Sequence, residues 1–226
     1  TMPGPLCSAD FTSNKTVVCQ TAGSNVILFA NTSYNGAFTS VQWSFPGGTP
    51  SNSTAASPSI IYSTPGVYPV TLKVINGTDS ASITKTNFIS VLPNSGAVYP
   101  FTEGYKSTAS LNGSDWFANS LDTINHWQLT SATACSGSKS VMLDNFSNPM
   151  NTKDELISPV INLSGAGTMS FRFKYAFARK DSANADQLQV YITKDCNNTW
   201  IQRLNLVGAA LETSPLQSTP FTPTLA

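Results

Sequence analysis

The sequence predicts an all-β protein with two consecutive sandwich-like units, and three observations lead to this prediction. Short runs rich in Val, Ile, Thr and aromatic residues recur along the whole chain, which is typical of strands. Fourteen glycines and fourteen prolines are spread over the 226 residues and divide these runs into short pieces. No long segment shows the 3.6-residue periodicity of an amphipathic helix, so we expect almost no helix.

The first unit covers residues 1–93, and its predicted strands are short. They comprise the run Val26–Phe29, the alternating residues Val41, Trp43 and Phe45, the run Ile60–Tyr62, the alternating residues Val70, Leu72 and Val74, and Ile83–Val91. Trp43 lies mid-strand and is expected to anchor the core, because a buried Trp removes about 150–250 Å² from water. About seven strands in a unit of this size are typical of a β-sandwich.

The order of aromatic, Pro and Gly residues in this unit resembles the PKD domain. The resemblance is carried by Phe11, Phe29–Ser33, Trp43–Pro50, Pro58–Ile60, Tyr62 and Pro65–Val74. The version with Phe45-Pro46-Gly47-Gly48-Thr49-Pro50 is similar to PKD modules in secreted proteins of Bacteroidetes-type bacteria. The resemblance implies an immunoglobulin-like sandwich that acts as a spacer or in adhesion, without catalysis.

The second unit covers residues 97–226 and follows the short linker Pro93–Gly96. A linker of this length predicts that the two units touch or sit at a limited range of angles. We again expect an all-β unit with long loops. Its predicted strands are Asn125–Leu129, Val141–Leu143, Glu155–Ser164, the alternating residues Phe171, Phe173 and Tyr175, and the alternating residues Leu188, Val190 and Ile192.

This second unit resembles jelly-roll modules of the MAM-like or choice-of-anchor type. The resemblance is carried by Phe101, Glu103, Gly104, Trp127, Ser136–Ser140, Leu156–Pro159, Asp186–Val190 and Asp195–Trp200. The tandem resembles the region downstream of the catalytic domain in cytophagalysin/pappalysin-type metallopeptidases. Such modules usually continue with a further Trp-containing strand and a closing strand. Because the sequence stops shortly after Phe221-Thr222-Pro223, we expect the jelly roll to be truncated at the C-terminus.

The resemblance to jelly-roll modules also implies a structural calcium ion in the second unit. Calcium takes about 6–8 oxygen ligands, and four acids lie at the edges of predicted strands: Glu103, Asp144, Asp154 and Asp186. If they converge at one end of the sandwich, a cation would neutralise their mutual repulsion. The alternative is that they are scattered turn residues.

The four cysteines, Cys7, Cys19, Cys135 and Cys196, allow three sets of disulfide pairings. Cys7 and Cys19 flank the first strand, so a hairpin-like return would bring them within reach, and we predict this disulfide. Cys135 and Cys196 would form the second, which requires two distant strands to be neighbours. Disulfides indicate a secreted or cell-surface protein, whereas four buried free thiols are the alternative. The spacing matches no zinc site.

Composition argues against several classes of function. Charged residues make up 11% of the chain, and the 12 basic and 12 acidic side chains cancel. Without a basic stripe we expect no nucleic-acid partner, and without an apolar run of about 18–20 residues we expect no membrane span. The single histidine, His126, cannot supply a His-Glu-x-x-His zinc motif. The sequence therefore predicts no active site of its own.

The predicted function is that of a non-catalytic accessory tandem of a secreted multidomain protein, a metallopeptidase by the resemblance. It would act as a spacer, docking or substrate-interaction module for the rest of its own chain. The alternative is a carbohydrate-binding or cell-surface adhesion module with a protein or glycan partner. That alternative needs an exposed, coplanar aromatic platform, for which the candidates are Tyr105, Trp116, Phe117 and Trp127.

One further segment, Asp195–Trp200, resembles an Asp-box hairpin. Asp195 is expected to accept hydrogen bonds from turn amides, Asn197 to adopt a positive φ, and Trp200 to tuck below the turn. We interpret this hairpin as part of the fold rather than as a binding site.

Overall fold

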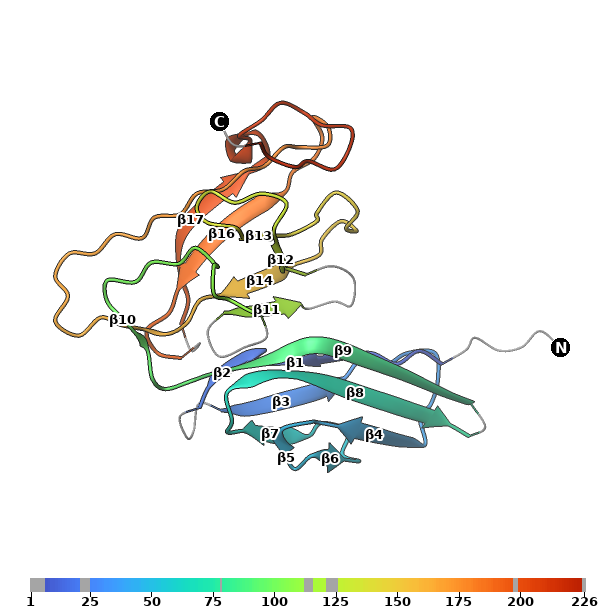
Figure 1. Ribbon diagram of the computed structural model, residues 1–226. Coiled ribbons are helices and arrows are strands. Elements are labelled where there is room, and N and C mark those ends of the chain that lie inside the picture. Colours follow the sequence, from blue (N-terminus) through green and yellow to red (C-terminus); the bar gives the residue numbers. More distant parts are fainter. Residues whose placement is uncertain are drawn as a thin grey trace.

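The computed structural model describes residues 7–20, 25–77, 79–111, 116–120, 126–196 and 199–224, and these residues form an all-β protein (Figure 1). The helical element within these ranges is a single 3-10 turn, η1 (Gly208–Leu211). No helix in the described part of the chain is long and apolar enough to span a bilayer. The predicted all-β fold class is confirmed.

The first unit is a sandwich of two sheets. One sheet has four strands, in the order β1 (Phe11–Ser13), β3 (Val26–Asn31), β7 (Ser59–Tyr62) and β5 (Gly48–Thr49). The other has five, in the order β2 (Val17–Cys19), β9 (Asp79–Leu92), β8 (Gly66–Asn76), β4 (Ser40–Ser44) and β6 (Asn52–Ser53). The pairs within each sheet are antiparallel, except that β2 runs parallel to the end of β9.

Trp43 is at the centre of this sandwich, as the sequence predicts, and only 2% of it is exposed. Its ring stacks on Phe45, with centroids 5.5 Å apart and an interplanar angle of 13°. Phe11 from the opposite sheet meets it edge-on at 5.4 Å. The indole N–H donates to the carbonyl of Ala55 at 2.9 Å, so the polar atom of this large side chain is satisfied inside the protein.

The second unit consists, within the described ranges, of two-stranded pairs. They are β10 (Ala97–Val98) with β15 (Ile161–Asn162), β11 (Phe117–Ser120) with β14 (Asp154–Ile157), β12 (Gln128–Thr130) with β13 (Ser140–Met142), and β16 (Gln187–Ile192) with β17 (Ile201–Val207). The strand predicted over Phe171–Tyr175 is wrong, because this segment pairs with no strand in the described part of the chain. The jelly-roll arrangement stays a prediction.

The two units differ in how many of their large apolar side chains are buried. The buried core lies mainly in the first unit, whereas most of the large exposed apolar residues belong to the second. These exposed residues are Val98, Tyr99, Met142, Met150, Leu163, Met169, Phe171, Phe173, Tyr175, Tyr191, Ile192, Trp200, Ile201, Val207 and Leu216. The second unit therefore leaves more of its large apolar side chains exposed than the first unit does.

Candidate functional site

The junction between the two units is a small hydrophobic core of its own. It contains Val17, Cys19 and Leu92 from the first unit and Phe117 from the second, all of them buried. Phe117 reaches it from β11, which Figure 1 shows beside β9. Side chains of β14 and the segment after it cover this core from the second unit.

The linker is fixed at the same place. The amide of Ala97 donates to the carbonyl of Val160 at 2.6 Å, where β10 joins β15. A Cβ atom added to Gly96 would lie 2.8 Å from the backbone nitrogen of Asn162, so only glycine fits this approach. The short linker is therefore part of the interface between the units rather than a free tether.

A disulfide joins the two units, and it corrects the predicted pairing. Cys19 in β2 is bonded to Cys196, with Cα atoms 5.6 Å apart, while Cys7 is buried and free and Cys135 is exposed and free. Cys7 cannot reach Cys19 because the two lie at opposite ends of β9. The Cys7 amide donates to Asp79, the first residue of β9, and Cys19 is in register with Leu92, the last.

The fourteen residues of β9 span roughly 40 Å at about 3.3 Å per residue, which rules out the predicted Cys7–Cys19 bond. The predicted Cys135–Cys196 bond is also wrong, because Cys196 is already bonded to Cys19. The bond that could not be predicted from the sequence is Cys19–Cys196, which joins the two units.

The four acids proposed to bind calcium have different surroundings. Both oxygens of Glu103 accept hydrogen bonds inside its own loop, from the amides of Gly104 and Tyr105 and from the indole of Trp116. Asp144 accepts the amide of Phe146 at 3.2 Å. In the described ranges no three Asp, Glu, His or Cys side chains lie together as a metal-binding group. Calcium binding by Glu103, Asp144, Asp154 and Asp186 stays a prediction.

The four aromatic residues proposed as a sugar-binding platform do not form one. Phe117 is fully buried in the junction. The rings of Tyr105 and Trp116 are in contact, 5.2 Å apart, but tilted by 54° rather than coplanar. Burial, together with the neighbouring Glu103 carboxylate, raises the pKa of Tyr105 to about 12. Trp127 is partly buried and its indole N–H points to the carbonyl of Asp154 at 3.4 Å.

The Asp195 turn links β16 to β17 and presents Cys196 to the junction. The Asp195 carboxylate accepts the amide of Thr199 at 2.9 Å and the hydroxyls of Thr199 and Thr193. Led by the Thr199 hydroxyl, these bonds lower the pKa of Asp195 to about 2. The expected turn role of Asp195 agrees with these bonds, but Trp200 is 43% exposed rather than tucked below.

The positive φ in this turn is described at Cys196, at 55°, whereas the prediction placed it at Asn197, which lies outside the described residues.

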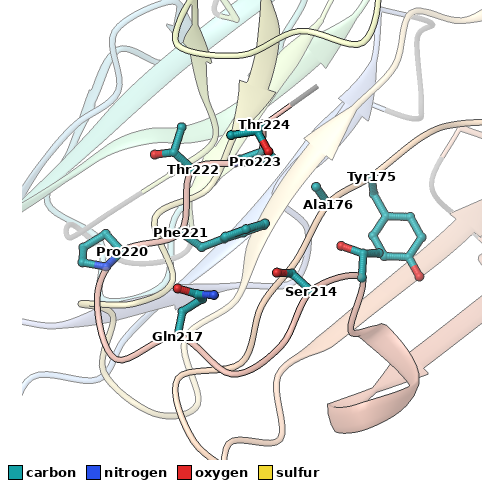
Figure 2. Close-up of a pocket in the computed structure, with 10 residues that line it drawn as sticks. Tyr175, Ala176, Ser214, Gln217, Pro220, Phe221, Thr222, Pro223 and Thr224 are labelled. Atoms are coloured by element: carbon teal, nitrogen blue, oxygen red, sulfur yellow. The ribbon is translucent and has the colours of Figure 1, made fainter. Parts of the chain in front are cut away.

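An open hollow of about 710 Å³ lies at the C-terminal side of the second unit (Figure 2). Its lining comes from two segments, Tyr175–Ala176 and residues 213–224. Figure 2 shows the ring of Phe221 between these two segments, with Ser214 and Gln217 nearby. The described lining carries amide and hydroxyl groups, which can form hydrogen bonds with a ligand, and it contains no carboxylate, imidazole, ammonium or thiol group.

Tyr175 also ends a row of exposed rings, Phe171, Phe173 and Tyr175, which we call the ring row. The centroids of consecutive rings are 5.5 and 6.0 Å apart, and the rings are tilted by 35° and 41°. The sequence showed the alternation of these residues, and we interpreted it as a strand of the second unit. Whether these rings lie on the surface or in the core depends on their exposure, and the alternation of residues does not indicate exposure.

The architecture and these features define a two-unit β protein whose first unit is an immunoglobulin-like sandwich. Residues 9–91 match the family model described as PKD domain. The first unit is therefore a PKD domain, as its sequence predicts. The search of curated proteins found no match.

Solved structures similar to this chain include two PKD domains from Vibrio. The PKD1 domain of Vibrio anguillarum Epp is 23% identical, with a TM-score of 0.32 over 39% of this chain and 99% of that one. The PKD1 domain of the Vibrio cholerae metalloprotease PrtV is 29% identical, with a TM-score of 0.31 over 38% of this chain and 98% of that one.

A third match is a structure of carbohydrate-binding modules from the β-sandwich superfamily, at 19% identity and a TM-score of 0.35. It covers 62% of this chain and 53% of the other. TM-scores at this level do not establish a shared fold, so the identification of the first unit rests on the family match.

Proposed function

We propose that this tandem is a non-catalytic accessory region of a secreted multidomain protein, in which it spaces and orients the neighbouring domains. The observation that supports this role is the junction. A buried core, a glycine-dependent linker and the Cys19–Cys196 disulfide hold the two units against each other. A spacer transmits orientation only when its parts do not swivel, and each of these three contacts opposes swivelling.

The disulfide also supports a location outside the cytosol. Disulfides persist in oxidising compartments such as the periplasm, the extracellular space and the cell surface. Half of the cysteines in this chain form one, and the bond links residues separated by 177 positions. We therefore propose that the protein is secreted or displayed on the cell surface.

A distance measurement between the two units tests the spacer role. One spin label goes on the native Cys135, which is exposed and free, and the second on a cysteine introduced at the exposed Lys73 of β8. We expect a single narrow distance distribution, which broadens when Cys19 and Cys196 are both replaced by Ser, so that no additional thiol takes up a label. A distribution equally broad with and without the disulfide would show that the units swivel, and would end the spacer proposal.

We further propose that the parent protein is a metallopeptidase. The support is the resemblance of both units together to the accessory region of cytophagalysin/pappalysin-type enzymes. The full-length gene product tests this directly, since the parent must contain a His-Glu-x-x-His zinc motif upstream of the tandem. A full-length sequence without such a motif would remove the peptidase and leave the spacer role intact.

A carbohydrate-binding function remains the second proposal, and the ring row is the observation in its favour. Exposed aromatic faces stack on sugar rings, and three of them follow one another here. A glycan array with the intact protein tests it. Binding that survives the Phe171→Ala and Phe173→Ala substitutions would exclude the ring row as the site.

A further inference from the structure

The segment 167–176, which leads to the hollow, is exposed although it is rich in large apolar side chains. Every residue from 167 to 176 is exposed. The exposed fractions are 47% for Met169, 67% for Phe171, 40% for Phe173 and 39% for Tyr175. Large apolar side chains gathered in one exposed stretch mark a surface that another molecule covers.

The ring contacts in this segment fit an extended chain that has no neighbouring strand in the described ranges. Its rings lie on one side at positions i, i+2 and i+4, the spacing of extended backbone. Residues 168–176 exchange no backbone hydrogen bonds with the described part of the chain. Pairing begins only at Phe177, whose carbonyl accepts the amide of Thr213 at 2.9 Å. In Figure 1 the orange chain that leads into β16 forms a long loop without an arrow. Such an edge is a template for strand addition.

Two basic side chains in this segment would favour a partner strand of opposite charge. Arg172 and Lys174 alternate with the rings and therefore project from the opposite face. In the described ranges neither is in an ion pair, since the three salt bridges there involve Lys85, Lys153 and Arg179. Directly opposed charges of unlike sign stabilise a pair of strands, and like charges destabilise it.

The geometry points to residues 169–175 as the acceptor of a β-strand from a partner protein, one in which apolar and acidic side chains alternate. The apolar side chains would cover the ring row, and the acidic ones would lie opposite Arg172 and Lys174. The backbone of the partner would supply the hydrogen bonds that this segment lacks. This inference rests on the proposed accessory role and names the surface through which the tandem would bind a partner. The test below concerns this surface alone, so it can fail while the accessory role stands.

A second copy of this chain fits the edge poorly. In an antiparallel pair centred on Phe173, Phe171 would face Tyr175, but Arg172 would face Lys174. Two such like-charged pairs would oppose the dimer on the face away from the rings. An acidic strand of a different protein meets the same backbone edge and the same rings without this repulsion.

The hollow extends the proposed surface at one end. It is lined by Tyr175 and Ala176 on one side and by residues 213–224 on the other (Figure 2). The hollow lies next to Phe177, where the backbone of this segment begins to form hydrogen bonds with Thr213. A partner strand running along 169–175 would therefore reach the hollow with its last side chain, next to Phe221.

Binding of synthetic peptides to the intact protein tests the inference. The probe is a seven-residue capped peptide in which valine alternates with glutamate. One control peptide carries lysine in place of glutamate, and another has proline at its centre to block backbone pairing. Isothermal titration with the wild type, Lys174→Glu and Lys73→Glu compares the same substitution on the proposed edge and on the exposed face of β8.

We expect the valine–glutamate peptide to bind the wild type and Lys73→Glu equally, and Lys174→Glu about fivefold or more weakly. The proline peptide should bind weakly to all three. Lys174→Glu should distinguish little between the two charged peptides, because the introduced carboxylate and Arg172 carry opposite charges. The inference is overturned by absence of binding of the valine–glutamate peptide, by equal affinity of the wild type for both charged peptides, or by an equal loss in Lys73→Glu. Dimerisation of the free protein through this segment, or a glycan that binds it, would assign the surface to another occupant.

Discussion

Reduction of the Cys19–Cys196 bond should destabilise the whole tandem, because this bond closes a very long loop. In the chain-entropy account, the stabilisation from a disulfide grows with the logarithm of the number of residues it encloses. For the sequence separation of 177, the loop term at 25 °C is about 5 kcal/mol. The free energy of unfolding of an ordinary domain is about 5–15 kcal/mol, so the expected loss is a large part of it.

Thermal unfolding followed by circular dichroism measures this effect. For a chain of this size, about 1 kcal/mol corresponds to about 2–4 °C in Tm, so reduction should lower the Tm by about 10–20 °C. Cys196→Ser should behave like the reduced wild type, and a reducing agent should have no further effect on it. Cys135→Ser is the matched control, because this cysteine is exposed and free and its replacement should leave the Tm unchanged.

Two results would refute this reasoning. If Cys196→Ser melts within about 2 °C of the wild type, the loop-closure entropy contributes almost nothing to stability. If non-reducing peptide mapping finds the Cys19 peptide linked to the Cys7 peptide, the junction described above is wrong, because Cys7 and Cys19 lie at opposite ends of β9.

Three further predictions concern stability. Trp43→Ala should cost about 3–5 kcal/mol in the free energy of unfolding, measured by urea denaturation, because it empties the centre of the sandwich; the control Leu28→Ala removes a side chain that is 53% exposed and should cost far less. Gly47→Ala should cost more than Gly77→Ala in the same assay, since both glycines have positive φ but an added Cβ meets the Tyr68 ring only at Gly47, at 2.2 Å; equal costs would show that the ring moves aside. Calcium at a hundredfold excess over its Kd should stabilise the protein by about 2.7 kcal/mol if the four proposed acids bind it, and melting curves that coincide with calcium and with EGTA would remove that site.

The first unit could be predicted from the sequence because its signals are local. Val70, Leu72 and Val74 alternate, and the structure buries all three inside β8. Trp43 and Phe45 likewise point to the core. The short strand β2 could not be predicted, since Val17–Cys19 is three residues long and does not alternate. Only its parallel pairing with the end of β9 makes it a strand.

The site could not be predicted because it depends on contacts between distant segments. Phe117 looked like a surface aromatic, yet contact with the first unit buries it. Phe171 and Phe173 were predicted to lie in a strand, yet no strand in the described part of the second unit pairs with them. Alternation reports that one face of a strand is apolar. It does not report whether the protein itself or a partner covers that face.

The turn that presents Cys196 offers a test by pH. Hydrogen bonds to the Asp195 carboxylate favour its charged form and lower its pKa from 3.8 to about 2, and the Thr199 hydroxyl is the largest cause. Since the folded pKa lies below the unfolded value, the stabilisation is fully present above about pH 4 and is lost as the pH falls towards 2. Above pH 4 the turn should therefore hold its shape.

Thr199→Val removes the hydroxyl but keeps the shape of the side chain and the backbone donor. The pKa of Asp195 should rise towards its ordinary value, so that the turn loses its order at a higher pH than in the wild type. A carboxyl ¹³C NMR titration of Asp195 measures this, and Thr54→Val, on the exposed surface of the first unit, is the matched control. An unchanged titration of Asp195 in Thr199→Val would mean that the hydroxyl does not donate to the carboxylate in solution. The order of the turn, and with it the placement of Cys196 against Cys19, would then not depend on this hydroxyl.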